Sequence, residues 1–168
     1  DSIPGGAGGE ELILSSDELA GELAEGGRLD RLVSTYANHD LRGAGCVAID
    51  PALLDTVNRM AEGYKVGSAR PSQAERPKRL RDSWFTNEDD VHLEPGSGKE
   101  DAARWLKRLR ELDCFMSMPW ANANASSVAK ANNPFLTYEG LQRGNHTIER
   151  ILGACLLYTS DAADDMQC

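Results

Sequence analysis

The chain has 168 residues, of which 40% are hydrophobic and 27% are charged, and its formal net charge is −9. This composition is typical of a globular protein and excludes a chain that is disordered throughout. The acidic balance argues against a nucleic-acid partner, because phosphate binding requires clustered Lys and Arg. No apolar run approaches the roughly 20 residues that a membrane-spanning helix requires.

Both ends of the chain are predicted to lie outside its core. Residues 1–11 are rich in glycine and are interpreted as a linker or as the remnant of a preceding loop. The sequence from Cys155 onward back-translates into the end of a common transposase-based sequencing-library adapter, so residues 155–168 are interpreted as an artefactual tail. Residues 12–154 are then expected to be a fragment of one α/β domain.

The first part of that fragment is predicted to form two helices. Residues 15–18 combine serines with acids, which suit the start of a helix. Leu12 is placed on the apolar face of this helix, which ends at Gly26-Gly27. A second helix is predicted over residues 29–36, because its apolar side chains follow the spacing of an amphipathic helix.

Two short apolar runs are predicted to be buried parallel strands. The first covers residues 46–50 and is followed by Pro51, which suits the first turn of a helix but not the middle of a sheet. The second covers residues 114–120. Between the strands, residues 65–99 are rich in Pro, Ser, Gly and charge, and they are interpreted as a long loop or lid with a small ordered patch at Trp84-Phe85.

Helical patterns and one ambiguous segment complete the chain. The helical pattern is found in three later ranges, 99–112, 126–131 and 141–152. Residues 135–138 are interpreted as a third strand or as an extended loop. Helices that alternate with strands predict an α/β fold with a parallel sheet. Because two or three strands cannot close a barrel, we expect a partial (β/α)-barrel-like domain or an open parallel-sheet domain.

Polar and aromatic side chains follow the two predicted strands, at the edge where such folds bind ligands. Asp50 follows the first strand, and Trp120, Asn122 and Asn124 follow the second. An acid, an indole and two amides suit a sugar, because the ring stacks on C–H groups while the polar groups bind hydroxyls. The alternative is structural, because Asp50 and Asn124 each precede a predicted helix and could cap it.

The sequence contains no recognisable catalytic or metal-binding motif. His39, His92 and His146 lack metal-ligand spacing, and phosphate-binding, dinucleotide-binding and nucleophile-elbow motifs are absent. We therefore expect no metal and no cofactor. Glycosidases require two carboxyl groups about 5–10 Å apart, and Asp50 is the one acid at a strand end. No catalytic residue is assigned.

Cys46 and Cys114 both lie near the starts of predicted strands. If those strands are neighbours, the pair could meet the ~4.4–6.8 Å Cα separation that a disulfide requires. An oxidised pair would indicate an extracytoplasmic compartment. The alternative is two independent buried thiols, which are common in strands.

Several segments resemble the actinobacterial family called domain of unknown function 6049. The most specific are Ala48–Asp55 and Met118–Asn124, with support from residues 17–32, 61–66 and 105–110. The resemblance implies a large secreted protein that is anchored to the cell membrane by a C-terminal transmembrane helix outside this fragment. Members are typically encoded near the lipid II flippase, which implies a role at the cell envelope.

The resemblance implies binding more than catalysis. No activity is established for the family, and its members often carry a tyrosine and aspartates where this chain has Trp120, Asn122 and Asn124. Amides in place of carboxylates weaken any acid–base role. We therefore expect a module that binds an envelope glycan or a membrane protein partner. The alternatives are a carbohydrate-active hydrolase or deacetylase on a (β/α) barrel, with Asp50 as one acid, and a structural scaffold for a membrane complex.

Overall fold

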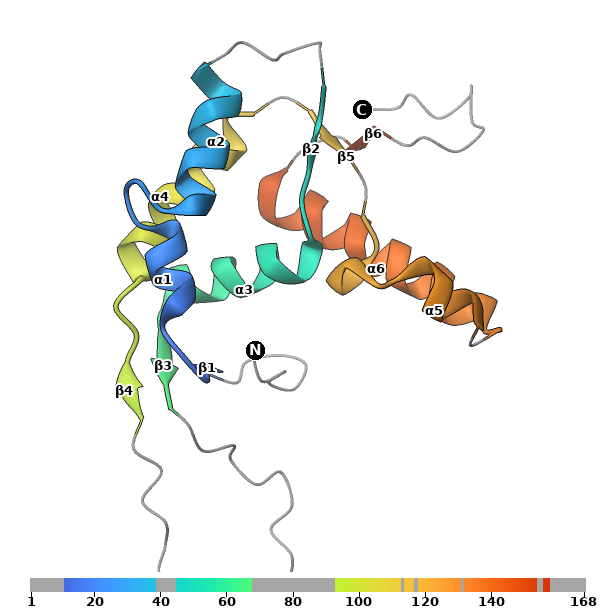
Figure 1. The fold of residues 1–168 in the computed structure, drawn as a ribbon, viewed down its shortest axis with the longest axis horizontal. Coiled ribbons are helices and arrows are strands. Elements are labelled where there is room, and N and C mark those ends of the chain that lie inside the picture. The colour runs from blue at the N-terminus through green and yellow to red at the C-terminus, as the bar shows by residue number, and fades with distance from the viewer. Residues whose placement is uncertain are drawn as a thin grey trace, which may run out of the picture.

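The computed structural model describes residues 11–38, 45–67, 93–112, 114–116, 118–130, 132–153 and 156–157. Figure 1 shows two separate groups of short strands with helices between and beside them, and one helical arm that extends to the side. Within these ranges, none of the helices combines the length and the apolar character of a membrane span. The ordered patch predicted at Trp84-Phe85 lies outside the described residues.

The first sheet contains β1 (Leu12–Leu14), β3 (Tyr64–Val66) and β4 (Glu94–Pro95), in the order β1-β3-β4. β1 pairs with β3 in parallel, and β4 pairs with β3 in the antiparallel direction. The helical placement of Leu12 is therefore wrong, because Leu12 and Leu14 are both buried on one face of a strand. The predicted loop 65–99 was too long at both ends, since strands β3 and β4 occupy its margins.

The second sheet contains β2 (Val47–Ala48), β5 (Phe115–Met116) and β6 (Leu156–Leu157), in the order β2-β5-β6. All of its strands are parallel. β2 and β5 lie within the two predicted strand ranges, but they are shorter than predicted and only partly buried, since Ala48 and Met116 are exposed. β6 lies within the segment 155–168 that was interpreted as an artefactual tail. With helices between the strands, the predicted α/β class is confirmed.

Two helices follow β1 directly. α1 (Glu18–Leu23) is short, and the chain leaves it through a turn in which Gly26 has a φ of +78°. α2 (Arg28–Asn38) buries Leu29 and Val33. Leu32 is one of the apolar residues whose spacing predicted this helix, but its side chain is 59% exposed, so the buried stripe of the helix is narrower than the sequence pattern indicated.

Helices α3 (Pro51–Glu62) and α4 (Lys99–Arg110) pack against each other in the middle of the fold. Their inner faces are almost wholly buried and consist of Leu54, Val57, Met60, Ala102, Trp105, Leu106 and Leu109. Each large apolar side chain buried in this way contributes about 1.5–3 kcal/mol relative to an exposed one. α3 ends at Gly63, where a φ of +125° favours glycine.

The C-terminal part contains a 3-10 turn, η1 (Trp120–Asn122), and the helices α5 (Ala125–Lys130) and α6 (Pro134–Leu152). The predicted strand or extended loop at residues 135–138 is wrong, because these residues form the first turns of α6. The side chain of Asn133 accepts a hydrogen bond from the backbone N–H of Leu136 at 3.2 Å, which caps the helix.

Only the second half of α6 packs on the core. Ile148, Ile151 and Leu152 are buried, whereas Phe135 and Tyr138 near its start are 66% and 59% exposed. In Figure 1 the first half of α6 and the adjacent α5 extend away from the other helices. One hydrophobic cluster joins the two sheets to α1, α2, α3, α4 and the end of α6.

Candidate functional site

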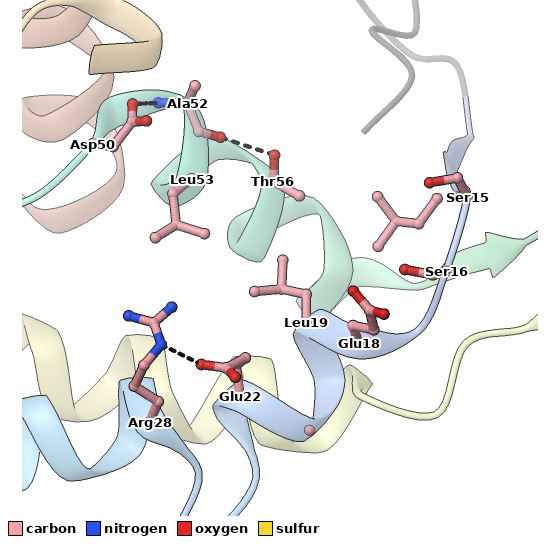
Figure 2. Close-up of a pocket in the computed structure, with 12 residues that line it drawn as sticks. Ser15, Ser16, Glu18, Leu19, Glu22, Arg28, Asp50, Ala52, Leu53 and Thr56 are labelled. Carbon is pink, nitrogen blue, oxygen red and sulfur yellow. Dashed lines mark hydrogen bonds and ion pairs between the residues drawn. The ribbon is translucent and has the colours of Figure 1, made fainter. Parts of the chain in front are cut away.

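A pocket of about 720 Å³ lies between α1 and α3. One wall is the turn that leaves β1, which contributes Ser15 and Ser16, and the opposite wall is the first half of α3. Figure 2 shows Asp50, Leu53 and Thr56 from the α3 side facing side chains of α1 across this space. Ser15 and Ser16 directly follow β1, and Asp50 follows β2 by two residues. Each of these strands pairs in parallel within its own sheet, and the carboxyl ends of parallel strands commonly bind ligands in α/β folds.

Asp50 both lines this pocket and caps α3. Its Oδ1 atom accepts a hydrogen bond from the backbone N–H of Ala52 at 2.9 Å, and Pro51 occupies the first turn. The side chain is half-buried. The structural and binding roles that the sequence left open for Asp50 are therefore compatible, since the cap engages one carboxylate oxygen.

The capping role predicts different effects for two substitutions of Asp50. Asp50→Ala removes the cap and should lower the free energy of unfolding by about 1 kcal/mol. Asp50→Asn retains a side-chain oxygen of comparable capping strength, so we expect a loss of only a few tenths of a kcal/mol. Urea denaturation of the two variants beside the wild type measures both values. Equal losses for alanine and asparagine would contradict the cap.

The remaining charges of the pocket come from α1 and from the start of α2. The Nε atom of Arg28 lies 2.7 Å from Oε2 of Glu22, and these side chains are 62% and 38% exposed. Glu18 is exposed and lines the pocket near Ser16 (Figure 2). Sequence reasoning did not assign these residues to a site. Recognition of Leu12–Leu14 as a strand would have placed Ser15 and Ser16 at a strand end.

The other predicted ligand-binding residues do not line this pocket. The Arg143 guanidinium lies 4.1 Å from the centroid of the Trp120 ring, so one face of the indole is already covered. Asn124 accepts a hydrogen bond from the N–H of Ser127 at 3.1 Å and so contacts the first turn of α5. Asn122 is exposed and has a φ of +46° in η1. Of the four residues predicted to bind a ligand, Asp50 is the one that lines this pocket in the described part of the chain.

Cys46 and Cys114 join the two strands that precede these segments. The structure links them by a disulfide with a Cα–Cα distance of 4.8 Å. Beside the bond, the N–H of Val47 donates to the carbonyl oxygen of Cys114 at 2.9 Å. The covalent link therefore fixes β2 to β5 at the ends opposite the Asp50 and Trp120 segments.

A hydrogen-bonded cluster supports the pocket wall at Ser16 and Glu18. Tyr64 on β3 donates its hydroxyl hydrogen to Oδ1 of Asp17. Oδ2 of Asp17 accepts from the backbone N–H and from the hydroxyl of Ser97, at 3.0 and 2.7 Å. The Tyr64 oxygen accepts in turn from the N–H of Gly98 at 3.0 Å. The cluster fixes the start of α1 to β3 and to the start of α4.

This cluster shifts the pKa of two groups. Burial works to raise the pKa of Asp17, but the hydrogen bonds from Tyr64 and Ser97 outweigh it and hold the pKa below its ordinary value of 3.8. Burial, followed by the hydrogen bond to Asp17, raises the pKa of Tyr64 to about 12. The neutral phenol and the ionised carboxylate are therefore the forms that the fold favours.

The two shifts predict the pH range in which the cluster stabilises the fold. The contribution of Tyr64 is complete below its ordinary pKa of 10.0 and is lost as the pH rises through about 12. The contribution of Asp17 is present above pH 3.8 and is lost as the pH falls through its lower folded-state pKa. Tyr64→Phe should cost about 2 kcal/mol at neutral pH and should weaken the alkaline loss. The free energy of unfolding in urea, measured across pH for Tyr64→Phe, tests this prediction, and Tyr138→Phe, whose ring is exposed, is the control. Equal losses of stability at alkaline pH in both variants would contradict it.

Comparison of the chain with protein-family models, with curated proteins and with solved structures found no match in any of the three. The function is therefore inferred from the pocket itself. Its volume of about 720 Å³ lies within the range of about 300–1,000 Å³ that is typical of small-molecule sites. Its lining combines hydroxyl groups, carboxylates and three leucines, which is a surface suited to a polar ligand that also carries C–H groups.

Proposed function

We propose that this chain is part of an extracytoplasmic, membrane-anchored cell-envelope protein that binds a glycan, without turnover, in the pocket between α1 and α3. The observation that carries this proposal is a pocket of about 720 Å³ that is lined by Asp50 and by several hydroxyl side chains. The proposed role is recognition of an envelope glycan, with a membrane protein partner as the alternative target.

The chemistry of the pocket supports a sugar ligand. Asp50 and Glu18 present carboxylate oxygens that accept hydrogen bonds from sugar hydroxyls. Ser16 adds a hydroxyl group, and Thr56 keeps acceptor capacity because its own hydrogen is donated to the carbonyl oxygen of Ala52 at 2.8 Å. Leu53 adds apolar surface for the C–H groups of a ring (Figure 2).

The proposed extracytoplasmic location of the protein and the proposed fold of its larger parent domain rest on separate observations. A disulfide between Cys46 and Cys114 suits an oxidising compartment, as does the resemblance to secreted envelope proteins. The parallel pairing of β2 with β5 and of β5 with β6 is what an arc of a larger (β/α)-barrel-like domain, or of an open parallel sheet, would contain. We propose such a parent domain for this chain.

A second candidate function is favoured by one feature of the same pocket. Glu18 and Asp50 are carboxylates that line it from the starts of α1 and α3, at opposite ends of the view in Figure 2. Hydrolysis of a glycosidic bond uses two such groups, one as the acid and the other as base or nucleophile. Turnover of a chromogenic glycoside that is lost in both Glu18→Gln and Asp50→Asn would favour this hydrolase over a binding module.

A matched pair of glycine substitutions tests the binding site. Gly21 lines the pocket on α1, and Gly140 lies on α6; a Cβ at either position meets nothing within 4 Å. Both Gly→Leu changes should raise helix stability by up to about 1 kcal/mol. Only Gly21→Leu fills the pocket, so only this variant should weaken binding, by at least about tenfold.

Binding is measured by calorimetry on the oxidised full chain, with soluble oligomers of β-1,4-linked glucosamine and N-acetylglucosamine as probes. A dissociation constant that rises in Gly21→Leu and not in Gly140→Leu supports the pocket as the glycan site. Absence of binding to every oligomer, or equal binding by both variants, would overturn the proposal.

A further inference from the structure

The charges of the pocket limit which glycans it can accept. We infer that the ligand carries a free ammonium group, so that the pocket prefers an amino sugar to its N-acetylated form. This inference rests on the proposed glycan-binding function and adds to it the charge of the ligand.

The ionic side chains of the pocket do not cancel. Its described lining contains three carboxylates, on Glu18, Glu22 and Asp50, and one cation, Arg28. Arg28 is engaged by Glu22 through the 2.7 Å ion pair. Glu18 and Asp50 therefore leave two negative charges without a cationic partner in the lining.

Helix ends reduce this negative charge without removing it. Asp50 caps the N-terminus of α3, and Glu18 lies in the first turn of α1. A helix N-terminus carries roughly half a positive charge, so the two ends together offset about one of the two negative charges. The pocket retains about one net negative charge. The whole chain, at −9, adds a field of the same sign.

A ligand that bears a carboxylate or a phosphate would be repelled from this pocket, whereas an ammonium group would be attracted. The hydroxyl groups of Ser16 and Thr56 are neutral and accept either an amino sugar or its N-acetylated form. The net negative charge of the pocket therefore discriminates between the amino sugar and its N-acetylated form. Because Glu18 is exposed, we expect a preference of about fivefold, as is usual for ion pairs in contact with solvent.

The test compares two probes that differ in acetylation alone. Oligomers of β-1,4-linked glucosamine and of N-acetylglucosamine, matched in length, are titrated into the oxidised full chain at a pH where the amines are charged. The glucosamine oligomer should bind about fivefold more tightly, and its advantage should shrink as ionic strength rises. Glu18→Gln should reduce the preference to about twofold or less.

A neighbouring acid supplies the control. Glu25 is exposed in the turn between α1 and α2 and does not line the pocket. Glu25→Gln changes the net charge of the chain by the same amount as Glu18→Gln, so it should leave the preference unchanged. A preference that falls equally in both variants would assign the effect to net charge and would overturn the inference.

The remaining outcomes separate this inference from the proposed function. Equal affinity for the two oligomers, with both lost in Gly21→Leu, would overturn the inference while the glycan site stands. Tighter binding of the N-acetylated oligomer would overturn it as well. If neither oligomer binds, both the proposed function and the inference are overturned.

Discussion

Replacing Cys46 and Cys114 together with alanine is expected to lower the free energy of unfolding by about 4 kcal/mol. The two cysteines are 68 residues apart in the sequence, so their bond closes a long loop in the unfolded chain. In the chain-entropy treatment, a loop of this length contributes about 4 kcal/mol through the restricted unfolded state. This loss is a large part of the roughly 5–15 kcal/mol that stabilises a typical domain.

The local structure explains why the fold depends on this bond. β2 and β5 are each two residues long, so their pairing supplies few backbone hydrogen bonds. Strands of this length are stable only when other contacts hold them together. Asp50 follows β2 by two residues, so loosening β2 should also widen the pocket and weaken ligand binding.

Urea denaturation of the double-alanine variant and of the wild type, each with and without reductant, measures the contribution. Reductant should destabilise the wild type by about the same amount as the double substitution and should leave the variant unchanged. A wild type that loses less than about 1 kcal/mol on complete reduction would show that the parallel pair forms without the bond.

The helices that could be predicted from the sequence are those with both a periodic apolar face and a recognisable start. α3 has the Asp50-Pro51 signal before it, and α4 places Glu100 and Asp101 in its first turn. These local signals act within a few residues, so they can be recognised without knowledge of the tertiary structure. The pairing of β2 with β5 was anticipated only as a condition for the cysteine pair.

The elements that were missed are short or carry a misleading pattern. β1 and β4 are three and two residues long, too short for an alternating pattern to be recognised. Residues 135–138 are apolar and aromatic, as in a strand, but Phe135 and Tyr138 are exposed on the helical arm. The capping signal at Asn133-Pro134 was available in the sequence and would have identified a helix start.

The candidate site was predictable only in part. Asp50 follows a strand in the sequence and lines the pocket in the structure. Glu18 and Arg28 line the pocket because α1, α2 and α3 all pack against α4, an arrangement that no local sequence pattern reports. Trp120 has the aromatic surface expected for a sugar site. One face of its ring is covered by Arg143, which lies 23 residues later in the sequence. Tertiary packing therefore decided which polar residues share a cavity.

Arg108→Ala is the second substitution with a large expected effect. The carboxylate of Asp30 is buried, and its Oδ1 atom lies 2.5 Å from the guanidinium of Arg108. Its Oδ2 atom accepts from the N–H of Gly26 at 3.0 Å, and Arg108 also donates to the hydroxyl of Ser34 at 2.6 Å. The network fixes α2, which begins with Arg28 of the pocket, to α4.

Removal of the guanidinium leaves the Asp30 charge buried beside an empty space. Breaking one side of a buried pair costs about 3–5 kcal/mol, and because Arg108 is about a third exposed, we expect a loss near 3 kcal/mol. Arg108→Met retains the apolar stem and should show that most of the loss is ionic. The free energy of unfolding of each variant is measured by urea denaturation at neutral pH.

Lys107 supplies the matched control, since it precedes Arg108 on α4 and its side chain is exposed. Lys107→Ala should change stability by less than about 0.5 kcal/mol. Asp30→Asn combined with Arg108→Met should be less destabilising than the sum of the two single changes, because the double variant leaves no unpaired charge. If instead the two losses add, Asp30 and Arg108 stabilise the fold independently, and the ion pair is not what holds α2 against α4.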